Sequence, residues 1–169
     1  ERSAEGRIHF WQVAVTMANE CPILGVGFNA YTQAYDTYDS SKGDFGTGRA
    51  VHSVWFGVLA ETGYIGLALY VILFVCALRN CHVARKAGLR DPTLRNLTPI
   101  AASFETSLFV FLVGGLFLSF QYNEMILHFL ATTMVIRRLV PAPAAHTPLE
   151  LAEARAIPAQ PLASLTVTR

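Results

Sequence analysis

Residues 52–63 read His52-Ser53-Val54-Trp55-Phe56-Gly57-Val58-Leu59-Ala60-Glu61-Thr62-Gly63, and the apolar run that starts here continues to about Leu78. At about 1.5 Å of rise per residue, residues 54–78 form a helix of about 37 Å, which is long enough to cross a bilayer with some tilt. A histidine therefore lies at the start of a predicted membrane span. If the helix starts at His52, Gly63 lies on the same face about 16 Å below it, because eleven residues make about three turns.

Small residues on one helix face favour the close approach of another helix or of a lipid-linked chain. Gly63 and Gly66 therefore predict a groove that runs into the membrane beneath His52. A histidine at the end of an apolar helix can also be an ordinary interfacial residue. The spacing alone leaves both interpretations open.

The composition is typical of a membrane protein. Hydrophobic residues make up 53% of the chain, charged residues make up only 15%, and the mean hydropathy is +0.38. The net charge of +1 gives no basic face for a nucleic acid. Because the first residue is Glu1 and there is no signal sequence, we interpret the chain as the C-terminal part of a larger multi-pass protein. We expect an all-α fold.

Three apolar segments predict membrane spans at about residues 53–78, 100–120 and 122–139. The second segment contains Glu105, and a carboxylate at this depth predicts either an interhelical hydrogen bond or part of a proton or substrate path. The third segment is short and needs its polar flanks to reach across a bilayer. The predicted transmembrane region therefore covers residues 53–140.

Basic residues set the expected orientation. Five of them follow the first span and two close the third: Arg79, Arg85, Lys86, Arg90, Arg95, Arg137 and Arg138. Loops rich in lysine and arginine remain in the cytoplasm. We therefore expect residues 1–52 on the opposite, periplasmic side, which excludes chemistry that uses cytoplasmic nucleotides.

Residues 1–52 predict a helical loop region that faces the substrate. Apolar residues recur every three or four positions over residues 4–19, which favours a helix, and Pro22 ends it. Glycines at 25 and 27 predict a tight turn, and residues 37–48 form a polar loop. One face of a possible second helix carries Tyr31, Tyr35 and Tyr38. Such a stripe is more often core or membrane-interface belt than a platform for sugars.

The composition changes after Val140. Five prolines are spread among alanines with no apolar periodicity: Pro141, Pro143, Pro148, Pro158 and Pro161. We expect residues 141–169 to be a disordered cytoplasmic tail without a catalytic role.

Few ionisable groups of the outer segment could do chemistry. They are Arg7, Arg49, His52, His9, Glu5, Glu20 and Glu61. An arginine fork can hold two phosphate oxygens, and an imidazole titrates near neutral pH, which suits a general base. Together they fit attack by a hydroxyl that displaces a diphosphate from a lipid-borne substrate. Taken alone, Arg7 is more simply a salt bridge or a loop anchor.

The sequence has no pair of histidines or cysteines at metal-ligand spacing and no legible Ser/His/Asp set. We therefore expect neither a metal nor another cofactor.

Three stretches, at residues 4–11, 22–28 and 52–67, resemble the O-antigen ligase/polymerase superfamily. The resemblance is closest to its O-glycosylation-ligase-like branch, which is associated with exosortase systems, and it covers about residues 3–78. It implies that His52, which with Gly63 matches the family's His-x10-Gly motif, activates the acceptor hydroxyl. It also implies that Arg7 holds a polyprenyl diphosphate. Arg49 has no secure family counterpart, and we include it for its charge and its proximity.

The resemblance implies a metal-independent glycosyltransferase of the bacterial inner membrane. Such an enzyme moves a glycan from a polyprenyl-diphosphate carrier to a glycan, lipid or protein hydroxyl at the periplasmic face. A repeat-unit polysaccharide polymerase of the same superfamily shares this chemistry. A lipid-linked sugar transporter or flippase and a noncatalytic assembly scaffold are the alternatives from other classes. Because the family's amino-terminal spans are not in this sequence, we expect the chain to be inactive alone.

Overall fold

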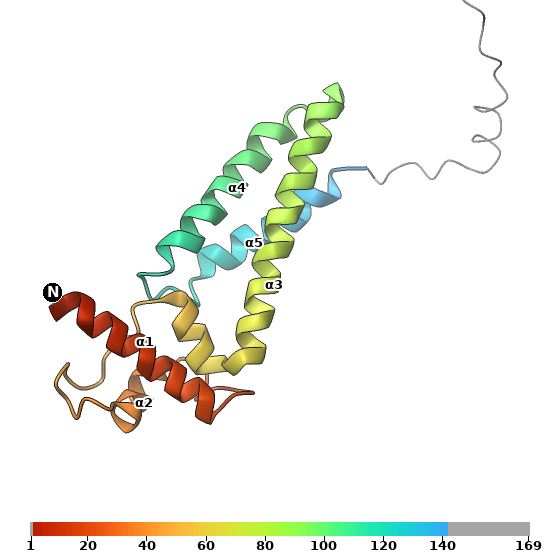
Figure 1. The fold of residues 1–169 in the computed structure, drawn as a ribbon. Helices are drawn as coiled ribbons and strands as arrows, with labels where there is room; N and C mark the ends of the chain where they lie inside the picture. The colour runs from red at the N-terminus through yellow and green to blue at the C-terminus, as the bar shows by residue number, and fades with distance from the viewer. Residues whose placement is uncertain (1, 142–169) are drawn as a thin grey trace, which may run out of the picture.

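The computed structural model describes residues 2–141, and the secondary structure of that range is entirely helical (Figure 1). The helices are α1 (Arg2–Glu20), α2 (Tyr31–Tyr38), α3 (Val54–Arg90), the short 3-10 helix η1 (Pro92–Leu94), α4 (Leu97–Gly114) and α5 (Glu124–Arg138). This confirms the all-α prediction for the described part of the chain. The predicted tail lies outside the described residues from position 142 onward.

The outer region, residues 2–53, packs on the first part of α3. Its core is a cluster of buried side chains from α1, α2, the loop before α3 and α3 itself: Phe10, Val13, Ala14, Met17, Tyr31, Tyr35, Val51 and Ala60. The helix predicted over residues 4–19 is confirmed, and it ends one residue before Cys21-Pro22. Two of the three tyrosines on the predicted second helix belong to this core, so the stripe is a packing feature.

The long helix α3 is broken at Gly63, whose backbone is non-helical with φ 69° and ψ −171°. Figure 1 shows the part before Gly63 running at a steep angle to the part after it. The helix begins at Val54, preceded by an extended Ser53 and by His52 with φ 52°. The prediction of one continuous helix from His52 through Gly63 is therefore wrong. A glycine accepts this left-handed φ without the steric cost that a side chain would bring.

The turn between α1 and α2 supplies hydrogen-bond partners for the backbone groups of α3 that the break leaves unpaired. In an unbroken helix, the Ala60 carbonyl would accept from the amide four residues later, which is that of Tyr64. Instead it accepts from the Val26 amide at 2.8 Å, and the Glu61 carbonyl accepts from the Gly27 amide at 3.1 Å. The break is thus stabilised from outside the helix.

The second half of α3 forms a bundle with α4 and α5. Its centre includes Phe74 of α3, whose ring stacks on Phe111 of α4 with centroids 5.5 Å apart. Helix α4 ends at Gly114, so the predicted second span is several residues too long, and a turn replaces its last part. Among the described residues, α3 and α4 are long and apolar enough to cross a membrane. The shorter α5 is not, and the third crossing stays a prediction.

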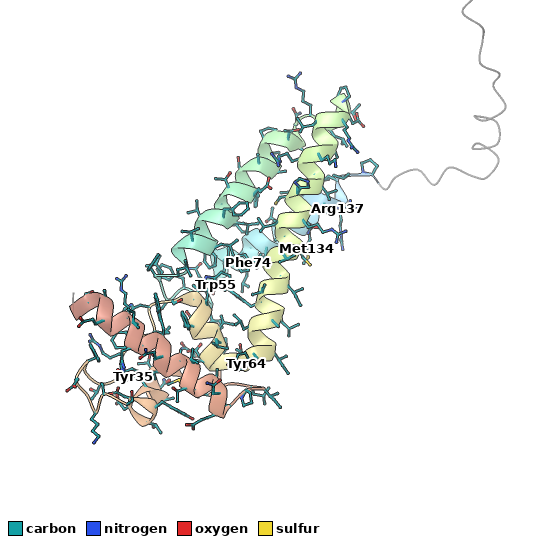
Figure 2. All side chains as sticks on the ribbon, in the orientation of Figure 1. Tyr35, Trp55, Tyr64, Phe74, Met134 and Arg137 are labelled. Atoms are coloured by element: carbon teal, nitrogen blue, oxygen red, sulfur yellow. The ribbon has the colours of Figure 1, made fainter. Side chains whose placement is uncertain are left out.

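The two basic clusters lie at one end of this bundle. Ala84 of α3, Ala101 of α4 and Ile136 of α5 pack together, and their chain neighbours Arg85 and Arg137 therefore lie at the same end of the bundle. Figure 2 shows Arg137 at the end of α5 that is away from the outer region. The outer region lies at the opposite end. This separation is what the orientation predicted from the basic residues requires, although sidedness itself remains a prediction.

Candidate functional site: a cleft between α1 and the loop before α3

The outer region contains a cleft of about 380 Å³. It is lined by Ser3, Gly6, Arg7, Phe10, Asp44, Phe45, Arg49 and His52. The structure therefore brings together the three residues predicted as a site, Arg7, Arg49 and His52, although Arg7 is far from the others in sequence. The roles of the three residues stay predictions.

Helix α1 places Arg7 at the cleft because Arg7 lies on the same side of the helix as residues that are fixed in the core. Phe10, Val13 and Met17 are at most 4% exposed, and they repeat at the three- and four-residue spacing of one helix face. Arg7 stands one turn before Phe10 and is half-buried. The ring of Phe45 packs beside Gly6, 3.5 Å from where a Cβ would be, which is an ordinary van der Waals distance.

The ring of Phe10 forms the floor between the two other candidates. The Arg49 guanidinium carbon lies 5.7 Å from the centroid of this ring, within the range of a cation–π contact. The ring of His52 lies 6.1 Å from it. His52 itself is exposed, while its neighbours Val51 and Ser53 are buried. The backbone on each side is thus fixed and the imidazole remains accessible to a ligand.

The Asp39 carboxylate organises the loop that forms the far wall of the cleft. It accepts hydrogen bonds from the Ser41 amide at 2.9 Å and the Gly43 amide at 2.8 Å, and it pairs with His9 Nε2 at 2.6 Å. Burial alone would raise the pKa of Asp39, but the hydrogen bonds from Ser41, Gly43 and His9 outweigh it and hold that pKa well below its ordinary value. His9 is therefore engaged in holding this loop, since its ring also stacks on Phe45 at 4.9 Å.

Asp44 and the two phenylalanines of the cleft escaped the sequence analysis. Phe45 packs against the core cluster, which brings the adjacent Asp44 to the rim. The ion pairs found among the described residues do not include Asp44. The polar, glycine-containing loop was recognised in the sequence, but nothing in its pattern marked which of its residues would line the cleft.

Glu61 lies outside this cleft. It is 3% exposed, and its Oε1 accepts a hydrogen bond from the Tyr31 amide at 3.1 Å, at the start of α2. A carboxylate at a helix N-terminus satisfies an amide that has no partner within the helix. The position of Glu61 beside the break is thus used to fasten α2 to α3.

The groove predicted beneath His52 at Gly63 and Gly66 is not present in that form. A Cβ on Gly63 would lie 2.6 Å from the Pro22 carbonyl oxygen, so the space beside this glycine is filled by the turn after α1. A Cβ on Gly66 would collide with the side chain of Thr62. The physical reason is the break, because it ends the continuous helical face on which the prediction relied.

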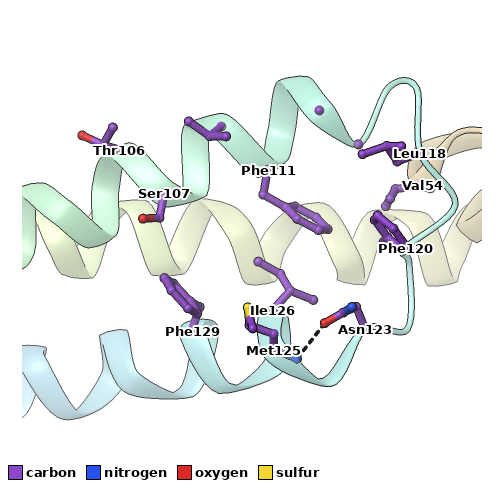
Figure 3. A pocket seen from close by; sticks show the side chains of 13 residues that line it. Val54, Thr106, Ser107, Phe111, Leu118, Phe120, Asn123, Met125, Ile126 and Phe129 are labelled. Atoms are coloured by element: carbon purple, nitrogen blue, oxygen red, sulfur yellow. Dashed lines mark hydrogen bonds between the residues drawn. The ribbon is translucent and has the colours of Figure 1, made fainter.

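An apolar cavity of about 480 Å³ opens instead between α4 and α5 (Figure 3). Val54, Phe111, Ile126 and Phe129 are among the side chains that line it. It comes close to the outer region, because the Val54 amide donates to the Gly115 carbonyl at 2.7 Å. Val54 follows His52 by two residues, so the cavity and the cleft adjoin the same short stretch of backbone.

Glu105 is engaged by a partner on a neighbouring helix. Its Oε2 lies 3.1 Å from Nε of Arg85, which connects α4 to α3. This is the interhelical interaction that the sequence left as one of two interpretations. The observed pair supports the structural interpretation of this carboxylate.

The part of the chain that contains the cleft is also the part that matches a known protein family. Residues 1–71 match the O-antigen ligase family. The O-antigen ligase match includes every residue that lines the cleft and the break at Gly63, and it stops within α3. The resemblance inferred from the three sequence stretches is thereby confirmed. The assignment to the exosortase-associated branch is not tested and stays a prediction.

A curated relative extends the similarity beyond the O-antigen ligase match. The exopolysaccharide production protein ExoQ of Rhizobium meliloti strain 1021 is 26% identical over 138 residues. These residues make up 79% of this chain and 31% of ExoQ, so the chain spans about a third of the relative's length. No solved structure matches the chain significantly.

Proposed function

We propose that the cleft of Arg7, Arg49 and His52 is where a glycan is transferred from a polyprenyl-diphosphate carrier to an acceptor hydroxyl. The observation that carries the proposal is the convergence of two arginines and an accessible histidine in one cleft of the segment that matches the O-antigen ligase family. Because the chain spans about a third of ExoQ, the proposal concerns the full-length protein.

The two arginines would bind the diphosphate. Arg7 comes from α1 and Arg49 comes from the loop before α3, and both side chains line the cleft. A guanidinium can hold two phosphate oxygens at once, and its charge stabilises the negative charge that grows on the departing diphosphate. The contact with the Phe10 ring already restricts the long side chain of Arg49. The side chain therefore loses less conformational entropy when the diphosphate binds.

His52 would act as the general base. The acceptor oxygen attacks the anomeric carbon of the donor and forms the new glycosidic bond, while the bond from that carbon to the phosphate oxygen breaks. The polyprenyl diphosphate leaves with the electron pair, and the imidazole takes the proton of the hydroxyl. Proton removal by a positioned base contributes about 10²–10⁴-fold to the rate. The step uses no metal or other cofactor.

The hydrocarbon tail of the carrier would lie in the cavity between α4 and α5. That cavity is apolar and starts at Val54, close to His52 in sequence. A donor held there by its tail presents its diphosphate at the outer end of the bundle. A ligase and a repeat-unit polymerase share this arrangement and differ in the acceptor, and the name of the ExoQ relative points to exopolysaccharide as the product.

The test compares His52→Ala with His82→Ala in the full-length protein in native membranes. His82 is an exposed histidine of α3 at the basic end, so its loss controls for a change in histidine content alone. His52→Ala should reduce transfer by about 10²-fold or more, while lipid-linked donor accumulates and the protein level stays unchanged. His82→Ala should transfer normally, and chelators should not inhibit either protein. Transfer by His52→Ala within a few fold of wild type would refute the proposal for this histidine.

A further inference from the structure

We infer that the turn between α1 and α2 inserts its apolar tip, Ile23 and Leu24, into the outer leaflet of the bilayer. These side chains are 62% and 78% exposed, which is unusual for adjacent large aliphatic residues. The inference depends on α3 crossing the membrane, but it does not depend on the transfer reaction.

The length of α3 shows why the bilayer would reach this turn. Beyond the break, the uncharged part of α3 runs from Tyr64 to Leu78 and ends at the exposed Arg79. At about 1.5 Å per residue it covers about 22 Å, whereas the hydrocarbon core of a bilayer is about 30 Å thick. A long charged side chain such as that of Arg79 can reach the interface from a backbone position inside the hydrocarbon, so Arg79 marks the region of one end. Up to about 8 Å of hydrocarbon can then lie beside the break at the other end.

The turn lies beside the break, at this end of the predicted span. Its Pro22 carbonyl accepts from the Tyr64 amide, and the backbone of Ile23 lies against Gly63. Figure 1 shows the turn beside the end of the longer part of α3. The exposed apolar surface of that part begins next to the turn and recurs at helical spacing, at Ile65, Leu69, Ile72 and Val75. The tip is therefore continuous with the lipid-facing surface of α3.

The turn is also built to hold these side chains outward. Hydrogen bonds from the Val26 and Gly27 amides to carbonyls of α3 fix its backbone. Gly25 lies so close to the Ala60 carbonyl that a Cβ there would collide with it. A rigid turn that exposes two large aliphatic side chains loses little conformational entropy when it enters lipid.

Nitroxide accessibility distinguishes lipid from the other possible surroundings. Leu24→Cys is labelled in the full-length protein in phosphatidylglycerol/phosphatidylethanolamine nanodiscs, in a background whose native cysteines are replaced by alanine. Ile72→Cys serves as the lipid-facing control on α3, and Gln33→Cys serves as the exposed control on α2. Collisions with oxygen, which concentrates in hydrocarbon, are compared with collisions with a water-soluble nickel chelate.

The label at position 24 should give an oxygen-to-nickel ratio like that at position 72 and several-fold above that at position 33. A ratio like that at position 33 would place the tip in water and overturn the inference. Low accessibility to both reagents would mean that other protein segments cover the tip, and it would equally overturn the inference. Loss of transfer in any of these variants does not change the conclusion from the oxygen-to-nickel ratio, because accessibility is measured on the folded, membrane-bound protein.

Discussion

The amide of Tyr64 donates a hydrogen bond to the carbonyl oxygen of Pro22, 2.9 Å away, across the break in α3. Together with the bonds from Val26 and Gly27 to α3, it joins two sequence stretches that were recognised separately as family-like. The glycine of the His-x10-Gly motif is thus the point where α3 receives the turn after α1. In this structure its role is to position the outer region relative to the membrane helix.

Replacing Gly63 by alanine should strongly destabilise the protein. Its backbone, with φ 69° and ψ −171°, lies in a region essentially restricted to glycine, where a residue with a side chain costs about 1–3 kcal/mol. In addition, the new Cβ would lie 2.6 Å from the Pro22 oxygen. Gly114→Ala is the matched control, because that glycine has open space and no positive φ. Thermal unfolding in detergent should show a clear loss for Gly63→Ala only; equal melting temperatures would contradict the role of the break.

Arg7→Lys should weaken donor binding although it keeps the charge. Lysine cannot form the two parallel hydrogen bonds of a guanidinium, and the loss of one charge-assisted bond at about 1.5 kcal/mol corresponds to about tenfold in Kd. Arg90→Lys, at the far end of α3, is the control. Binding of a polyprenyl-diphosphate glycan measures the effect. Unchanged affinity in Arg7→Lys would make Arg7 a structural anchor.

Asp39 should make the outer region sensitive to acid. Its pKa is lowered in the folded protein, so its contribution to stability is complete above the ordinary value of 3.8 and is lost as the pH falls below that value. Asp39→Asn removes this titration. The melting temperature of the wild type should therefore fall more steeply below about pH 4 than that of Asp39→Asn. Parallel curves would show that Asp39 does not stabilise the loop.

Filling the cavity between α4 and α5 should impair the use of the lipid-linked donor. Ser107→Trp places a large ring in the cavity, whereas Val113→Trp changes an exposed position of α4 that does not line it. The first variant should raise the KM for the donor several-fold, and the second should not. If a water-soluble acceptor showed the change in KM instead, the cavity would not be the place of the tail.

Labels at Lys42 and Lys86 should report opposite sides of the membrane. Lys42 lies in the loop beside the cleft, and Lys86 lies at the basic end of α3. The positive-inside rule puts Lys86 in the cytoplasm, so a membrane-impermeant amine reagent added to cells with a permeable outer membrane should modify only Lys42. Modification of both lysines from outside would contradict the orientation, and the proposed transfer at the periplasmic face with it.

The periodicity of apolar residues predicted well those helices that bury one face against the core. The helix over residues 4–19 and the second helix with its tyrosines were found because apolar spacing records a buried face. The course of α3 was missed because hydropathy is the same on both sides of Gly63. An isolated glycine within an apolar run signals a kink only when another segment supplies hydrogen bonds, and those come from residues 22–27.

The candidate site was predicted in part for a related reason. Residue chemistry and the family resemblance singled out Arg7, Arg49 and His52, which line one cleft. Asp44 and the floor residue Phe10 were missed, since their places depend on how the loop folds around Asp39. The groove at Gly63 was wrong because it assumed a straight helix.

The hydrogen bonds across the break also set an order of events during synthesis. The ribosome makes residues 22–27 before residues 60–64, so the bonds that join the turn to α3 cannot form until the later residues are in place. If the predicted orientation holds, the early residues must cross the membrane and wait there, with the amides of Val26 and Gly27 bonded to water. The cleft can close around His52 only after α3 has inserted and offered its carbonyls, so maturation of the outer region is coupled to membrane integration of the helix that follows it.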